Sequence, residues 1–230
     1  MKRFLSALVI LVILGSCNSK TENTMTVSGN VKGLKKGTLY LQQFKDSTLV
    51  ILDSIQIQGN GNFEFAQEVP EPEIFYLYLD KADNNDVNDR ITFFGEAGEI
   101  TINTTWNTFA LDPTISGSES HIAMTEFNDM MSKFNIRELE LVGLSTQPEI
   151  QADSVVFDSI KKLINHNGIG SYRYAINYGL TNSTSYATPY LVLSVAEVIN
   201  PTFLDSIYNN LSPEVAASKY GKDLKAYLNK

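Results

Sequence analysis

The sequence has only one cysteine, two histidines and one tryptophan among its 230 residues. A single thiol cannot form a disulfide within the chain, and a CxxC redox site needs two, so thiol:disulfide oxidoreductase activity is excluded. Basic residues are also few, 18 against 26 acids, and they form no cluster. Because binding to nucleic acid needs clustered lysines and arginines, we expect no nucleic-acid partner.

Catalytic and metal-binding motifs are absent as well. No G-x-S-x-G nucleophile elbow or H-E-x-x-H zinc motif occurs, and no pair of acids is singled out for glycoside chemistry. His121 and His166 lack carboxylates at a metal-ligand spacing, and the expected place of His166 at a helix end favours a capping role. We therefore expect no catalytic residue, no metal and no cofactor.

One acidic stretch has the composition of a calcium loop without its spacing. The stretch DKADNNDVND contains four aspartates, which are Asp80, Asp83, Asp86 and Asp89. An EF-hand-like loop needs oxygen ligands at alternate positions, a glycine at the sixth and an acid at the twelfth, and no register supplies them. The composition favours a solvated loop.

The N-terminus carries the clearest signal in the chain. Two basic residues precede a run from Phe4 to Leu14 that is apolar apart from Ser6. This run is too short for a membrane-spanning helix and is typical of a secretory signal. The following LGSC resembles the bacterial lipobox, which predicts cleavage after Ser16 and diacylation of Cys17. The alternative is an ordinary signal peptide with a chance cysteine.

The anchor has consequences for charge and location. Two or three acyl chains on Cys17 suffice to hold a domain on a membrane, whereas one is marginal. Removing residues 1–16 removes Lys2 and Arg3, which changes the formal charge from -8 to -10. Asn18 follows Cys17 where, by resemblance to the Gram-negative sorting rule, an aspartate would retain the protein in the inner membrane. We therefore expect an outer-membrane lipoprotein of the cell envelope, with the leaflet left open.

The first half of the mature chain has the pattern of a β-domain. Short runs of alternating apolar and polar residues are separated by turn residues. In TLYLQQF, Leu39 and Leu41 share one face of the expected strand, and Tyr40 and Gln42 share the other. Further along the chain, Asn60-Gly61 suggests a tight hairpin. We expect strands at 26–31, 38–44, 50–57, 63–69, 74–79, 91–94 and 100–104.

The second half has helical periodicity. Apolar residues recur at near-helical spacing, Gly117-Ser118 is a start signal, and Ser212 is an expected N-cap. We expect helices at 121–135, 149–165, 189–199, 201–211 and 213–228, with His166-Asn167-Gly168 as the stop of the second. The segment 166–188 has no clear pattern, and long structureless segments are often functional or misread.

These patterns predict an α+β fold, an N-terminal antiparallel β-sandwich followed by a C-terminal helical region. The expected divisions are a signal peptide over residues 1–16, a tether over 17–24, the sandwich over 25–116 and the helical region over 117–230. The apolar fraction of 43% is enough for a real core.

Six stretches occur in an order that matches a known family. They are VSGNVKGLKKGTLYL, LDSIQIQGNGNFEF, FGEAGEITI and ISGSES, followed by TNSTSYATPYLVL and LSPEVAASKYGKDLKAYL. This order resembles the Bacteroidota family called domain of unknown function 4369, a lipoprotein module that usually precedes a thioredoxin-like domain with a WCxxC motif. The chain stops at Lys230 without such a domain, so the resemblance does not imply an oxidoreductase.

Two further features are candidate sites. Five Asp-Ser pairs, each followed by threonine, isoleucine or valine, resemble the O-glycosylation acceptor sequence of Bacteroidota envelope proteins, although Asp-Ser pairs also cap helices and turns. Their serines are Ser47, Ser54, Ser154, Ser159 and Ser206. Aromatic residues form two candidate sugar-stacking groups, for which a core role is the commoner alternative. These groups are Trp106 with Phe109, and Tyr172, Tyr174, Tyr178 and Tyr186.

The sequence therefore favours a non-catalytic binding or assembly lipoprotein of the envelope, held on the membrane by its lipid, with an envelope protein partner and an unidentified small-molecule or glycan ligand. Two alternatives stay open. One is a hydrolase acting on glycans or peptides, which a pocket with two close carboxylates or a Ser-His pair would support. The other is a docking subunit for a separate thioredoxin-like protein, which an exposed apolar patch beside the C-terminal helices would support.

Overall fold

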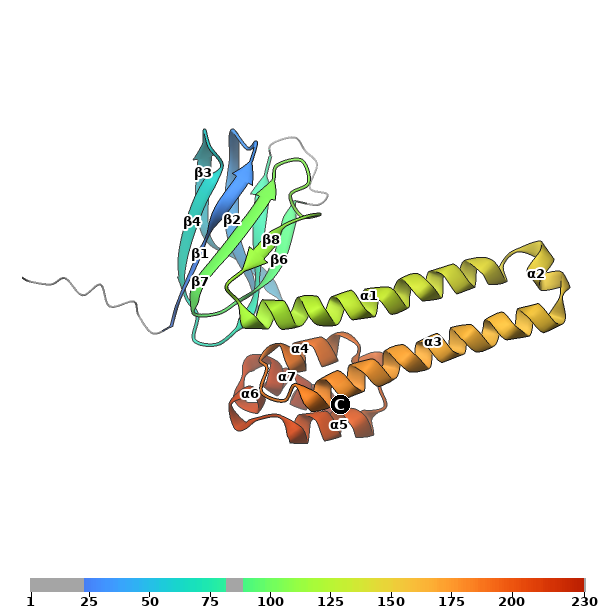
Figure 1. Cartoon of the computed structure of the whole chain (residues 1–230). Helices are drawn as coiled ribbons and strands as arrows, with labels where there is room; N and C mark the ends of the chain where they lie inside the picture. The colour runs from blue at the N-terminus through green and yellow to red at the C-terminus, as the bar shows by residue number, and fades with distance from the viewer. Residues whose placement is uncertain (1–22, 82–88, 230) are drawn as a thin grey trace, which may run out of the picture.

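The computed structural model describes residues 23–81 and 89–229 (Figure 1). Within these residues, eight strands form two four-stranded sheets and are followed by helices. The strands are β1 (Thr24–Lys32), β2 (Lys36–Lys45), β3 (Thr48–Gln58), β4 (Asn62–Glu68), β5 (Glu73–Asp80), β6 (Arg90–Gly95), β7 (Gly98–Thr105) and β8 (Thr114–Ser116). All seven expected strands are present, and the short β8 is additional.

The two sheets form the expected sandwich. Their strand orders are β4-β1-β7-β8 and β3-β2-β5-β6. Every pair is antiparallel except β1 with β7, which run parallel with Val27 opposite Ile100. Inward-facing residues of both sheets, such as Leu39 and Leu41 of β2 and Val27 of β1, are fully buried between them. Alternate burial along each strand thus produces the core that the alternating sequence predicts.

The turn at Asn60-Gly61 differs from the expected hairpin. It joins β3 to β4, and these strands lie in different sheets. Gly61 has φ +74, and a Cβ there would lie 2.2 Å from the carbonyl oxygen of Val31, so the turn needs glycine for a close backbone approach. The tight hairpin is instead β2–β3, in which Asp46 and Ser47 both have positive φ, 47° and 66°.

The helical region begins with two long antiparallel helices, α1 (Glu119–Ser145) and α3 (Ser154–Thr181), joined by the short α2 (Pro148–Ala152). They form an arm that extends well past the sandwich, with α2 at its tip (Figure 1). As expected, Ser118 caps α1, and its side chain accepts a hydrogen bond from the amide of His121 at 3.0 Å.

The predicted helix stop at His166-Asn167-Gly168 is wrong, because α3 continues to Thr181. Asparagine and glycine are weak helix formers, but contacts with α1 stabilise this part of α3. Asn167 donates to the carbonyl oxygen of Phe134 at 2.9 Å, and Gly170 lies against the Phe134 ring. The segment 166–188, which has no clear sequence pattern, is therefore mostly helix, and His166 lies inside α3 rather than at a cap.

The remaining helices form a second core against the sandwich. They are α4 (Ala187–Ser194), η1 (Ala196–Val198), α5 (Pro201–Asn210), α6 (Pro213–Ala217) and α7 (Lys219–Leu228). Ser212 caps α6 as expected, and Ser218 caps α7. Ile74 of β5 and Phe94 of β6 pack into this helical core rather than into the sandwich. Among the described residues, no helix has the length and apolar character needed to span a membrane.

Candidate functional site

An aromatic cleft lies where the sandwich meets the C-terminal helices. It has a volume of about 420 Å³ and is lined by residues of β2, the β2–β3 turn, β5, α4 and α7. These residues are Phe44, Asp46, Ser47, Ile74, Tyr76, Tyr190, Lys219, Tyr220 and Asp223. Four aromatic rings with a few polar groups at the edge are the composition of a small-molecule or oligomer site. We refer to this site as the aromatic cleft.

The rings of the aromatic cleft support one another. Phe44 and Tyr76 meet edge to face, with centroids 5.6 Å apart, and Tyr190 and Tyr220 are 5.0 Å apart. Phe94, which is fully buried, contacts both Tyr190 and Tyr220 and supports this wall from behind. Because edge-to-face and tilted pairs are the favoured aromatic geometries, the cleft is held in shape without a ligand.

Polar contacts fix the wall formed by α7. The hydroxyl oxygen of Tyr220 accepts a hydrogen bond from the amide of Ile74 at 3.0 Å, and Lys219 forms an ion pair with Glu73. Burial raises the pKa of Tyr220 and, in part against the nearby charge of Arg90, that of Tyr76. Both phenols are therefore neutral donors or acceptors at physiological pH.

A buried amide lies beside the aromatic cleft. Gln42 is 6% exposed, and its Oε1 has no hydrogen-bond partner among the described residues. It lies directly opposite Tyr76 in the sheet and, since side chains alternate along a strand, on the same face as Phe44. An unsatisfied buried acceptor costs about 1–3 kcal/mol, so a donor that reaches it would bind favourably.

The arm exposes apolar side chains along its length. Leu139 is 73% exposed and Val155 is 75% exposed, although both belong to long helices. The other large exposed apolar residues of the arm are Ile122, Ile136, Val142, Leu144, Val156, Leu163, Ile169 and Leu180. A pair of helices buries only the stripe along which the two touch, so the remaining apolar surface of each stays in solvent. Exposed apolar surface of this kind marks interaction sites.

Besides the aromatic cleft, an apolar groove lies at the base of the arm. It has a volume of about 600 Å³, and its lining includes Met131 of α1, Tyr172 of α3, and Leu193 and Val198 near η1. Val198 is 72% exposed, and Phe203 of the neighbouring α5 is 43% exposed. This apolar groove is the kind of surface beside the C-terminal helices that a docking role requires.

A third pocket, of about 570 Å³, contains carboxylates at the sandwich–arm junction. Its lining includes Glu71, Glu96, Glu119 and Ser120. Glu96 accepts from the amide of Glu119 at 2.5 Å and from the hydroxyl of Ser120 at 2.6 Å, and Glu71 accepts from the amide of Lys219 at 3.0 Å. These carboxylates therefore cap the N-termini of α1 and α7, which is a structural role.

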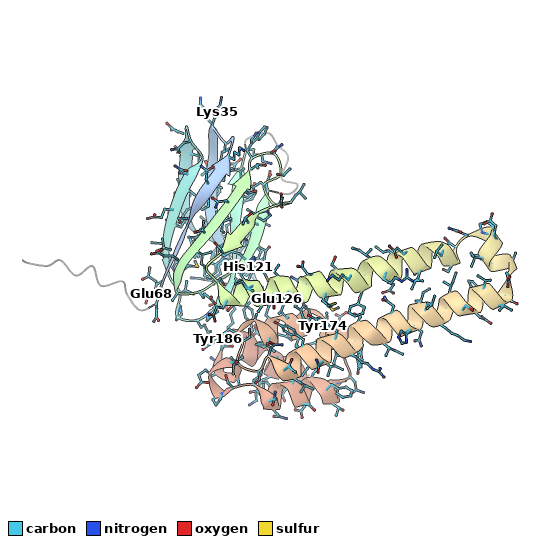
Figure 2. All side chains as sticks on the ribbon, viewed as in Figure 1. Lys35, Glu68, His121, Glu126, Tyr174 and Tyr186 are labelled. Carbon is cyan, nitrogen blue, oxygen red and sulfur yellow. The ribbon has the colours of Figure 1, made fainter. Side chains whose placement is uncertain are left out.

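The two histidines lie in different helices and do not form a site together. His121 sits on the first turn of α1, at the end of the sandwich that meets the arm, whereas Lys35 marks the opposite end (Figure 2). The Nδ1 atom of His121 accepts a hydrogen bond from the amide of Phe94 at 3.4 Å. Burial lowers the pKa of His121, although the charge of Glu96 acts to raise it. His166 is exposed inside α3. Among the described residues, no group of histidine, cysteine and acids could hold a metal ion.

The acidic stretch is only partly described. Asp83 and Asp86 lie outside the described residues. Asp89, expected in a solvated loop, is instead 1% exposed and forms an ion pair with Lys81. The ion pair explains the difference, because a partner of opposite charge offsets much of the cost of removing a carboxylate from water.

The candidate modification sites fall into two groups, those outside the described residues and those within them. Cys17 and Ser16 lie outside the described residues. All five serines of the Asp-Ser pairs are exposed: Ser47, Ser54, Ser154, Ser159 and Ser206. One of these pairs, Asp153-Ser154, also has the local capping role, since Asp153 accepts from the amides of Val155 and Val156 at the start of α3. Each of these serines is therefore accessible to solvent, and Ser47 borders the aromatic cleft.

The aromatic groups suggested by the sequence do not form a surface platform. Phe109 is fully buried, and the half-exposed Trp106 packs over Gly33, where a Cβ would lie 2.7 Å from the indole. Tyr174 and Tyr178 pack with Phe127 of α1, at centroid distances of 5.7 and 4.9 Å. They therefore belong to the junction between arm and body, where Figure 2 places Tyr174 on α3.

Sequence reasoning missed the aromatic cleft because its residues come from four separate elements. One signal was available, since alternation already placed Tyr40 and Gln42 on the face of β2 opposite the core leucines. Phe44 continues that face, and the register of β2 with β5 brings Tyr76 opposite Gln42. Nothing in the sequence indicated that Tyr190 and Tyr220 would close the other wall.

Comparison with known proteins supports the family resemblance. Residues 25–124 match the model of the family described as Domain of unknown function (DUF4369). The match spans the strands of the sandwich and the first residues of α1. No curated protein matches the chain. The resemblance drawn from the sequence is thus confirmed over these residues, and the family description assigns no molecular function.

Proposed function

We propose that this protein is a membrane-anchored, non-catalytic binding or assembly lipoprotein of the Bacteroidota cell envelope, tethered through an acylated Cys17. The observation that carries the proposal is the arm, whose α1 and α3 expose Leu139, Val155 and other apolar residues to solvent. Apolar side chains at this level of exposure favour burial against a partner. The protein would hold the arm at a membrane surface for such a partner.

The arm is tested by placing a charge on it. Leu139→Glu puts a carboxylate at a position that is 73% exposed, so the fold should tolerate it, while a partner that covers Leu139 should not. The matched control is Ile51→Glu, which changes an apolar residue of the sandwich that is 59% exposed. Envelope complexes are measured by in vivo cross-linking and native electrophoresis of the host membranes.

The expected result is loss of a specific envelope complex in Leu139→Glu and its retention in Ile51→Glu. The proposal fails if the arm variant forms the same complexes as the unmodified protein. The anchor is tested separately with Cys17→Ser, which should move the protein from the membrane to the soluble fraction.

A second candidate function is favoured by the apolar groove at the base of the arm. A docking subunit for a separate thioredoxin-like protein would use exposed apolar surface beside the C-terminal helices, and Val198 and Phe203 provide it. Val198→Asp should then break a complex with a thioredoxin-like protein of the same host, as measured by co-purification. If the two proteins do not copurify even without the substitution, this version is excluded.

A further inference from the structure

The aromatic cleft differs from the arm in what it can recognise. Its exposed surface is built from the faces and edges of Phe44, Tyr76 and Tyr190 rather than from aliphatic side chains. The carboxylates of Asp46 and Asp223 in its lining can only accept hydrogen bonds, as can the buried Oε1 of Gln42 beside it, whereas the lining hydroxyls both donate and accept and the ammonium of Lys219 donates. A matching ligand therefore has apolar faces that stack on rings and several hydroxyl donors around its edge.

We propose that the aromatic cleft binds a neutral pyranose residue of a glycan chain. The C–H face of such a sugar stacks on the aromatic wall, and its hydroxyls donate to the acceptors at the rim. Phe44 is 45% exposed, so its side chain has room to move and let a hydroxyl approach Gln42. The lone acceptor of Gln42 is then satisfied in the complex.

Two cations of the protein already lie against the rings of the aromatic cleft. The guanidinium of Arg90 already lies 6.0 Å from the centre of the Tyr76 ring, and Nζ of Lys219 lies 5.5 Å from that of Tyr220. These two cations take up the attraction that an aromatic wall offers to an ammonium group. A further cation would be repelled by these two groups and attracted by Asp46 and Asp223, so the local charges do not select a cation.

Anions and proline-rich peptides fit less well. Asp46 and Asp223 place negative charge around the cleft of an already acidic chain, which opposes an anionic ligand. A proline-rich segment could stack on the rings, but prolines have no amide N–H to donate to Gln42 or the aspartates. A sugar supplies both the stacking face and the donors.

The inference goes beyond the proposed assembly role, because the aromatic cleft shares no residue with the exposed apolar positions of the arm. The two proposals can therefore fail separately. Leu139→Glu should leave sugar binding unchanged, and substitutions in the cleft should leave the arm complexes unchanged.

The test is calorimetric titration of the full-length protein in detergent with soluble neutral oligosaccharides. The probes are the hexasaccharides of α-glucan, β-glucan, β-mannan, β-xylan and chitin, each up to about 10 mM, since single-site sugar affinities near 1 mM are still measurable there. Choline and decaproline serve as the cationic and proline-rich comparisons. Binding of at least one hexasaccharide, and of neither comparison, is expected.

Variants assign the binding to the cleft. Phe44→Ala should weaken the affinity about threefold to tenfold, which corresponds to one lost aromatic contact. The matched control is Phe203→Ala, which removes a phenylalanine that is 43% exposed and meets Tyr172 edge to face at the same 84° interplanar angle as Phe44 and Tyr76. Gln42→Leu, which removes the unpartnered Oε1 together with the rest of the side-chain amide, should weaken binding.

Saturation-transfer NMR on the unmodified protein gives an independent reading, in which sugar C–H protons should receive magnetisation from aromatic protons. The proposal is overturned if no hexasaccharide binds, if choline or decaproline binds instead, or if Phe203→Ala weakens binding as much as Phe44→Ala. Unchanged affinity in both Phe44→Ala and Gln42→Leu overturns it as well.

Discussion

One hydrogen bond connects the last helix to the sandwich, and its removal gives a defined prediction. The amide of Ile74 in β5 donates to the hydroxyl of Tyr220 in α7, two residues 146 positions apart in the chain. Both residues are buried, with 5% and 9% exposure. Tyr220→Phe keeps the ring and its contacts with Phe94 and Tyr190 but leaves a buried N–H without an acceptor.

The expected cost follows from that orphaned donor. An unsatisfied buried amide costs about 1–3 kcal/mol, and a domain of this size loses about 2–4 °C of melting temperature per kcal/mol. Tyr220→Phe should therefore lower the free energy of unfolding by about 1–3 kcal/mol in urea titrations. The amide of Ile74 should also exchange its hydrogen faster, since its protection depends on that hydroxyl.

The control is Tyr172→Phe, which removes a hydroxyl for which the described part of the chain shows no hydrogen bond. This substitution should change stability by no more than about 0.5 kcal/mol, as is usual away from specific contacts. If Tyr220→Phe and Tyr172→Phe have equal stability, or if the Ile74 amide keeps its protection, the assigned role of Tyr220 is refuted.

Three further predictions concern the junction and the anchor. Glu96→Gln should lower stability by about 1–2 kcal/mol, measured by urea unfolding, because a neutral amide caps α1 less well than a carboxylate; a hydrolase role would instead show itself as lost hydrolysis with unchanged stability. The pKa of His121 is lower in the folded protein than in the unfolded chain. The neutral imidazole therefore contributes to folding stability above its ordinary pKa near 6.5, and this contribution is lost as the pH falls through the lower folded pKa. His121→Asn, which keeps an acceptor for Phe94 but does not titrate, should flatten the decline of stability below about pH 6.5, and an unchanged pH profile would contradict this. Intact mass of protein from its own host should show an acylated N-terminal Cys17, with added hexoses if any Asp-Ser serine is modified, whereas a mass equal to the lipidated polypeptide alone would remove the glycosylation hypothesis.

The strands were predictable because their signal is local. Alternation with period two needs only a few residues to be read, so all seven expected strands are found. The three residues of β8 are too few to show a period. The pairing of the strands was harder to predict. The turn at Asn60-Gly61 has the residues of a tight hairpin but carries the chain from one sheet to the other. Turn residues specify a reversal and not the partner of the next strand.

The arm shows where local signals fail. His166-Asn167-Gly168 has the composition of a helix stop, yet α3 continues because Asn167 and Gly170 contact Phe134 of α1. Those contacts exist only once the two helices are side by side, and the sequence separates them by more than 30 residues. The aromatic cleft is hidden for the same reason, because its two walls come from distant parts of the chain.

Glycines in α3 provide a final test of this packing, since two of them should respond in opposite directions to the same change. A Cβ added at Gly168 meets no atom of the described residues within 4 Å, so Gly168→Ala should raise the free energy of unfolding by about 0.5–1 kcal/mol through the better helix propensity of alanine. A Cβ at Gly179 would lie 2.7 Å from Cδ1 of Ile207, which is fully buried between α3 and the C-terminal helices. Gly179→Ala should therefore lower stability by about 1–3 kcal/mol, as overpacking of a core does. Urea unfolding of both variants measures the difference, and hydrogen exchange locates it. If the two substitutions had the same sign, α3 could not pack as described, and the arm would have to leave the body of the protein at a different point.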